Sequence, residues 1–238
     1  MAENGQFQGF PEQAMTFFAE LKNNNDREWF NERKEVYQKE ILAPAQDFVV
    51  ALGDRLKLLS AGIEYDTRTN GRGSIMRIYR DIRFSKDKSP YKTNLGIMFW
   101  EGKRKKTENP GYFFHMDDSG AILYAGLYQF PKVYMNAYRN AVIDEELGNE
   151  LETLINEMTR NGEYKVGGEH YKRVPRGYDA QHPRGQLLRH NGLWSESPKI
   201  DAGIVANPDL VDVCFDHASM MLPLHRWLVD VDTGMEGG

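Results

Sequence analysis

Cysteine is almost missing from this chain: its 238 residues include only Cys214. One thiol cannot form an internal disulfide framework, so we expect a reducing compartment, the cytoplasm. Long apolar runs are also missing, whereas a bilayer-spanning helix needs about 18–20 consecutive apolar residues. Residues 1–8 have neither the basic start nor the apolar run of a secretory signal. The sequence therefore predicts no membrane association.

Several signature motifs of enzymes are missing as well. The sequence has no P-loop, no Gly-rich dinucleotide-binding fingerprint and no Gly-x-Ser-x-Gly nucleophile elbow. It also lacks a His-Glu-x-x-His pair, a Cys pair and a calcium loop, so the spacing predicts no metal site. The sequence therefore does not indicate a cofactor, a reaction or an oligomeric state.

Charge is present in quantity but is unevenly distributed. The whole chain carries −5, whereas residues 68–106 contain twelve Lys/Arg and three Asp/Glu, a local balance of +9. The remainder therefore carries −14. A positive segment in a negative protein indicates a surface that meets an anion. An alternative is that these cations only solvate a sheet edge and prevent its aggregation.

The order of apolar patterns predicts an α+β fold. Helical spacing dominates residues 11–60, strand candidates fill residues 63–127, and helical and loop-rich segments follow over residues 131–230. Short connections between the strands favour antiparallel pairing. We therefore expect a central, mainly antiparallel sheet with helices from both ends of the chain packed on it. We expect a single domain over residues 1–238, ordered over about residues 7–230, because no linker divides the middle.

Residues 75–84 alternate as a strand would, which sorts the side chains onto two faces. Ile78, Ile82 and Phe84 share the face expected to pack against helices. Arg80 is on the same face, either at the rim of the sheet or buried with a carboxylate partner. The other face is a polar ridge. Its arginines can hold an anion through paired hydrogen bonds, with an aspartate fixing one of them.

The site residues follow from this ridge, the loop after it and a second basic stretch at residues 164–190. The predicted anion-binding residues are Arg77, Arg80, Arg83, Lys86, Lys88, Tyr91, Lys92 and Arg176. Asp81 and His115 are the candidate catalytic groups, since an aspartate can orient an arginine and histidine can move protons near neutral pH.

The block Arg80-Asp81-Ile82-Arg83-Phe84-Ser85-Lys86-Asp87-Lys88-Ser89-Pro90-Tyr91-Lys92-Thr93 resembles a known sequence signature, and Pro110-Gly111-Tyr112 and Val174-Pro175-Arg176-Gly177-Tyr178 resemble its later parts. The family is mostly bacterial and is catalogued as domain of unknown function 2461. The resemblance covers about residues 7–230 and implies a single domain. It implies no activity.

Three functions stay open at this point. The first is binding of a phosphorylated or carboxylated small molecule in a basic pocket, with catalysis there as an open question. The second is binding of single-stranded nucleic acid, because aromatic and basic residues interleave in this region. The third is docking of the basic face onto an acidic partner.

Overall fold

The computed structural model describes residues 6–233, which form two compact units. Unit 1 comprises residues 6–99, 113–123 and 199–216, and unit 2 comprises residues 100–112, 124–198 and 217–233. The single domain expected from the sequence stays a prediction. Its outermost parts, residues 1–5 and 234–238, lie outside the described residues.

The strands form one six-stranded sheet in the order β1-β2-β3-β4-β6-β5. β4 pairs with β6, and β6 with β5, in antiparallel register. The α+β prediction with a mainly antiparallel sheet is confirmed. The strands are β1 (Ile63–Glu64), β2 (Leu95–Glu101), β3 (Gly111–Asp117), β4 (Gly120–Leu127), β5 (Lys165–Glu169) and β6 (His190–Glu196).

Unit 1 begins with helices whose apolar faces form its core. The Asp26 carboxylate caps α2 by accepting hydrogen bonds from two backbone amides, a role that aspartate often fills before a helix. Phe48 of α4 packs against Phe114 of β3 at a ring distance of 4.6 Å, and both are buried. The helices are α1 (Glu12–Asn23), α2 (Arg27–Glu32), α3 (Lys34–Val36), a π-helical turn (Tyr37–Leu42), α4 (Ala43–Leu59) and α7 (Ala202–Val205).

Unit 2 has its own core, built by α5 (Lys132–Ile143), α6 (Glu145–Thr159) and the second part of α8 (Leu210–Thr233). Arg184 is almost fully buried in this unit and donates to the Val142 carbonyl oxygen, in the last turn of α5, where a helix leaves its carbonyls without intrahelical partners. It also donates to the Asp144 carbonyl, which accepts the Gly148 amide of α6 as well. A Cβ at Gly148 would lie 2.4 Å from the Arg184 Nε, so this glycine makes room for the guanidinium.

Three sequence predictions about elements are wrong. Residues 75–84 form no regular strand, because only Ile75 and Tyr79 make isolated bridges. The sheet does not end at residue 127, since β5 and β6 lie in the segment expected to be loop-rich. A proline inside a helical pattern predicts an interruption, but α8 continues through Pro223.

Candidate functional site

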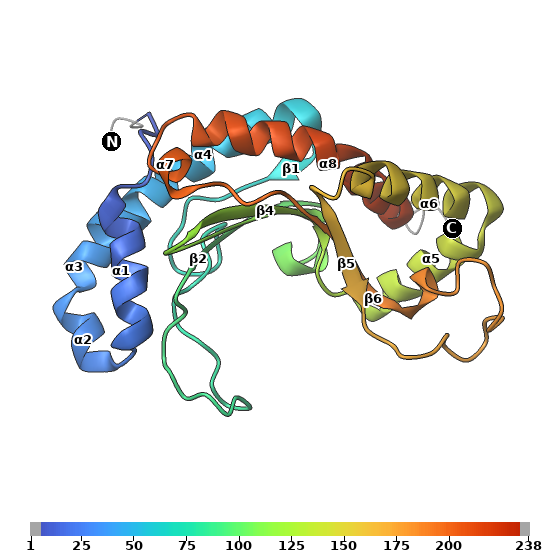
Figure 1. The fold of residues 1–238 in the computed structure, drawn as a ribbon, viewed down its shortest axis with the longest axis horizontal. Helices are drawn as coiled ribbons and strands as arrows, with labels where there is room; N and C mark the ends of the chain where they lie inside the picture. Colours follow the sequence, from blue (N-terminus) through green and yellow to red (C-terminus); the bar gives the residue numbers. More distant parts are fainter. Residues whose placement is uncertain (1–5, 234–238) are drawn as a thin grey trace. The chain divides into compact units, whose positions relative to one another are not determined.

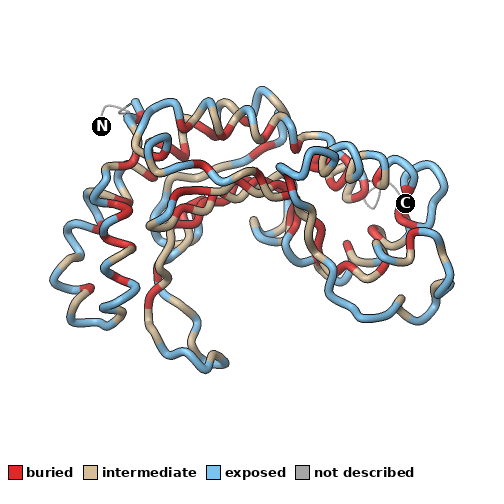
Figure 2. The backbone as a smooth tube through the Cα atoms, in the orientation of Figure 1, coloured by how far each residue is buried: buried red, intermediate tan, exposed pale blue. Residues whose placement is uncertain are grey.

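Residues 76–93 form a two-legged extension, which we call the arm. Its legs are joined by the Tyr79–Tyr91 bridge, and the Arg80 amide donates to the Pro90 carbonyl at 2.9 Å. Beyond this point no ladder continues, because Pro90 lacks an N–H and two aspartates bond to backbone amides two residues ahead. The arm extends from the start of β2 as an irregular double strand (Figure 1) and is largely exposed toward its end (Figure 2).

A pocket of about 400 Å³ lies between α2 and the arm, within unit 1. Helix α2 contributes two polar residues, and the two legs of the arm contribute the rest. The lining residues are Arg27, Asn31, Tyr79, Arg80, Ile82, Pro90 and Tyr91. Of the predicted anion-binding residues, only Arg80 and Tyr91 are among them.

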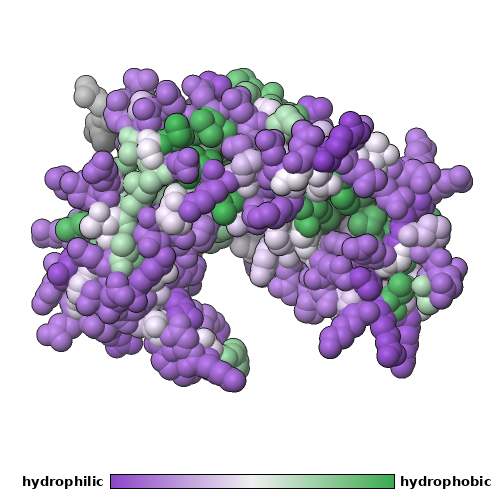
Figure 3. Space-filling model, viewed as in Figure 1, coloured by the Kyte–Doolittle hydropathy of each residue, from purple (hydrophilic) through white to green (hydrophobic). Residues whose placement is uncertain are grey.

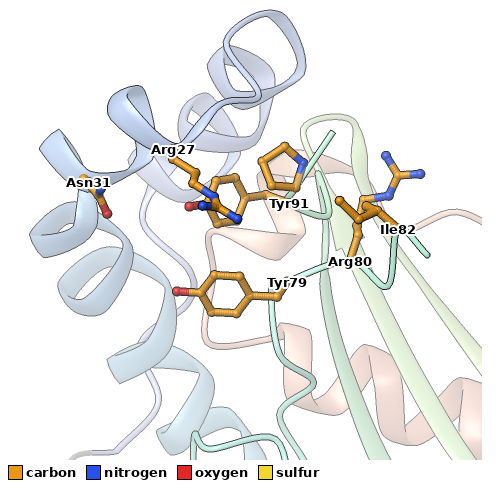
Figure 4. A pocket seen from close by; sticks show the side chains of 7 residues that line it. Arg27, Asn31, Tyr79, Arg80, Ile82 and Tyr91 are labelled. Atoms are coloured by element: carbon orange, nitrogen blue, oxygen red, sulfur yellow. The ribbon is translucent and has the colours of Figure 1, made fainter. Parts of the chain in front are cut away.

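Polar groups gather at one end of this pocket (Figure 4). The Arg27 guanidinium, the Asn31 carboxamide and the hydroxyls of Tyr79 and Tyr91 all lie on that side. In the described part of the chain, Arg27 makes no ion pair. Burial and the neighbouring Tyr79 raise the pKa of Tyr91, while Arg27 works in the opposite direction. The Tyr91 phenol therefore stays protonated at neutral pH and can donate a hydrogen bond.

Arg80 lines the pocket with its stem, while its guanidinium points away from the tyrosine rings (Figure 4). The guanidinium pairs with the Asp87 carboxylate and donates to the Ser89 carbonyl at 3.3 Å. Hydrogen bonds from Ser89, and then from Arg80, hold the pKa of Asp87 far below its ordinary value. Arg80 thus has the expected carboxylate partner, which already matches its charge, but the pair is only partly buried.

The polar ridge predicted from strand alternation is also wrong, because the arm is irregular. Arg83 bonds Asp81 through two nitrogens, at 2.9 and 2.6 Å, and its side chain is 76% exposed. These bonds lower the pKa of Asp81 to about 2. Asp81 therefore fixes an arginine as expected, but it is ionised across the neutral range and poorly suited to accept a proton there.

The remaining cations of the arm do not line the pocket. Lys88 donates to the Ile82 carbonyl at 2.9 Å, and Lys86 is exposed. Lys92 is partly buried, and burial, assisted by nearby Arg77, lowers its pKa. Arg77 itself contacts the Gly71 turn, where an added Cβ would lie 2.4 Å from its Cγ.

Phe84 lies near the turn of the arm with 95% of its surface exposed. The sequence predicts that it packs against helices, and this is wrong. In the space-filling view, a small hydrophobic area at the end of the arm is surrounded by hydrophilic atoms (Figure 3). The Arg83 guanidinium lies 5.8 Å from the ring centre.

His115 lies on β3 of unit 1 and is not among the pocket residues. Burial lowers its pKa, while Asp117, at 3.9 Å from Nε2, acts in the opposite direction. It is therefore mostly neutral near pH 7 and retains the chemistry of a base. Arg176 belongs to unit 2 and is exposed. The roles assigned to both stay predictions.

Sequence reasoning missed Arg27 and Asn31 altogether. Both lie on α2, which the sequence identifies only by its cap and apolar positions. Their spacing of four residues places them on one helix face, but nothing in the sequence shows that this face meets the arm. The long-range contact that brings the two together is visible only in three dimensions.

Residues 6–233 show neither a metal cluster nor a membrane-spanning helix. No cluster of three or more His, Cys, Asp or Glu there is arranged to hold a metal ion. None of the helices there combines the length and apolar character needed to cross a bilayer.

The comparisons with known proteins agree with the resemblance seen in the sequence. No curated protein matches the chain. Residues 13–227 match the model of a family described as conserved hypothetical proteins, DUF2461. This match includes α2, the arm and β3, so every pocket residue falls inside it. The chain belongs to the DUF2461 family of conserved hypothetical proteins.

Proposed function

We propose that this protein binds a small molecule carrying a phosphate or carboxylate, in the pocket between α2 and the arm. The observation that supports this most directly is the uncompensated Arg27 guanidinium beside the hydroxyls of Tyr79 and Tyr91. A guanidinium and neutral donors on one side match an oxyanion, because each hydrogen bond to a charged group contributes about 1.5–3 kcal/mol.

The proposal is one of binding and includes no reaction. Asp81 is ionised and bonded to Arg83, so it has no proton to exchange near neutral pH. His115 does not line the pocket. We therefore assign the anion to Arg27 of α2 and no longer to Arg77 and Arg83 of the expected ridge.

A thermal-shift survey tests the proposal. The protein is heated with phosphorylated and carboxylated metabolites one at a time, because a ligand that binds the native state raises the unfolding temperature. We expect a stabilising compound among them, and we expect Arg27→Gln to abolish its effect while Arg83→Gln keeps it. If the stabilisation is equal in both variants, the pocket is not the binding site.

A second candidate function, binding of single-stranded nucleic acid, is favoured by the exposed aromatic rings of the arm. Tyr79 is 58% and Phe84 95% exposed, and in the chain Tyr79 precedes Arg80 and Phe84 follows Arg83. Stacking on such rings contributes about 1–3 kcal/mol per base. Affinity for an oligonucleotide falls steeply with salt when several phosphates are bound, and Phe84→Ser would weaken it at every salt concentration.

We infer a cytoplasmic location for this function. Cys214 is the chain's single cysteine, and it is buried. Burial raises the pKa of its thiol far above the ordinary value, so it is unreactive in the native protein. A chain without an internal disulfide is typical of a reducing compartment.

A further inference from the structure

The pocket between α2 and the arm has two chemically different ends. Arg27 and Asn31 lie at the polar end with the two hydroxyls, whereas Ile82 lies on the opposite side (Figure 4). Pro90 and the stem of Arg80 complete the apolar part of the lining. An inorganic anion would use only the polar end and leave the apolar part against water.

Aromatic rings form the wall between these ends. Tyr91 is buried and stacks on Phe30 at a ring distance of 4.2 Å and an angle of 20°. Tyr79 packs against Tyr91 at 5.4 Å and is 58% exposed. Phe30 therefore holds the Tyr91 ring in place, and Tyr91 in turn packs against Tyr79. The exposed surface of Tyr79 is available to a flat molecule.

We propose that the ligand of this pocket is a small aromatic acid: one planar ring bearing one phosphate or carboxylate. The inference rests on the proposed function and specifies the ligand class of the same site. The acid would meet Arg27 and the tyrosine hydroxyls, and the ring would lie against Tyr79, Ile82 and Pro90. A volume of about 400 Å³ is near the lower end for small-molecule pockets, which suits one ring and its acid group.

Isothermal titration calorimetry with matched ligands tests the inference. Phenyl phosphate and glycerol 1-phosphate carry the same anion, and only the first has a ring. We expect phenyl phosphate to bind about threefold to tenfold more tightly, which is the range that aromatic stacking contributes. Benzoate against acetate repeats the comparison for a carboxylate.

Variants at Tyr79 test whether its ring causes the preference for phenyl phosphate over glycerol 1-phosphate. Tyr79→Phe keeps the ring and loses the hydroxyl, whereas Tyr79→Leu loses both. We expect Tyr79→Phe to retain the preference for phenyl phosphate and Tyr79→Leu to remove it. Tyr79 is largely exposed, so both variants should fold. Circular dichroism checks that they do, and Ile82→Ser offers an independent change at the apolar end.

The outcomes separate this inference from the proposed function. If no phosphate or carboxylate binds the wild-type protein, the proposed function fails and the ligand class fails with it. If both phosphates bind equally and Arg27→Gln weakens both, anion binding stands and the aromatic class is overturned. A preference for phenyl phosphate that survives both Tyr79→Leu and Ile82→Ser also overturns it.

Discussion

Asn25 substitutes for a strand partner of Tyr91. Its carboxamide donates to the Tyr91 carbonyl at 3.0 Å and accepts from the Tyr91 amide at 3.0 Å. One side chain thereby satisfies both backbone groups of a residue 66 positions away. Together with the Phe30–Tyr91 stack, this pair fixes the returning leg of the arm against the start of α2. Tyr91 lines the pocket, so this attachment holds one of its walls.

Asn25→Ala should destabilise the protein. It leaves the Tyr91 amide and carbonyl without their partner, and an unpaired buried polar group costs about 1–3 kcal/mol. Urea denaturation measures the free energy of unfolding. The matched control is Asn23→Ala, whose carboxamide makes one exposed bond to Ala19, and which should cost less than about 0.5 kcal/mol. Equal losses in the two variants would contradict this role of Asn25.

Arg80 and Arg83 should differ in how far they order the arm. Arg80 joins the two legs through Asp87 and the Ser89 carbonyl, whereas Arg83 bonds only to Asp81, two residues away. We expect Arg80→Gln to increase the rate of proteolytic cleavage within residues 76–93 severalfold, because cleavage follows local opening. Arg83→Gln should leave that rate nearly unchanged. If only Arg83→Gln speeds cleavage, then Arg83, and not Arg80, orders the arm.

The free energy of unfolding should decrease as the pH is lowered through the range in which His115 takes up a proton. Its folded pKa lies below the ordinary value of 6.5, so the unfolded chain binds more protons there. The free energy of unfolding therefore decreases as pH falls from about 6.5 toward the folded pKa. Burial lowers the pKa of His190 too, and this adds to the same slope.

His115→Gln should flatten part of that slope, measured by urea denaturation between pH 7.5 and pH 4.5, values chosen from the ordinary histidine range. His170→Gln, at an exposed position, serves as the control. If His115→Gln leaves the slope as steep as in the wild type, His115 does not titrate as described.

Arg184 has a structural role despite its position in a basic stretch. Its guanidinium bonds the Val142 carbonyl at 2.6 Å, the Asp144 carbonyl at 2.8 Å and the Asn149 carboxamide at 2.7 Å. We expect Arg184→Lys to cost at least about 2 kcal/mol of unfolding free energy, because a lysine cannot reproduce the planar fork. Arg176→Lys, at an exposed position, should change it by less than about 0.5 kcal/mol. If Arg184→Lys changes the free energy of unfolding as little as Arg176→Lys does, the hydrogen bonds of Arg184 do not stabilise the fold.

The sequence predicts the elements that depend on local patterns. The Asp26 cap, the apolar stripe of α4 and the turn at residues 117–120 all follow from residues close in the chain. β5 is missed because Lys165–Glu169 contains two glycines and little strand-forming sequence. The arm is misread because local hydrogen bonds of Asp81 and Asp87 replace the ladder that alternation suggests.

The site is only partly predictable for a related reason. The sequence identifies the basic arm, and Arg80 and Tyr91 do line the pocket. It cannot show that neighbouring carboxylates neutralise Arg80 and Arg83, since each pairing depends on the path of the loop. Nor can it show that Arg27 faces the arm, because that contact is held by the Asn25–Tyr91 bonds. The density of basic residues therefore indicates the region of the site, but only the three-dimensional structure shows which residues line the pocket.

The most direct test of the account compares two arginines in one titration. The affinity of phenyl phosphate is measured by calorimetry for the wild type, Arg27→Gln and Arg83→Gln. Loss of Arg27 should weaken binding at least about tenfold, as expected for a hydrogen bond to a charged group, while loss of Arg83 should leave it unchanged. Unchanged affinity in Arg27→Gln together with weaker binding in Arg83→Gln would place the anion on the exposed arm and contradict the pocket.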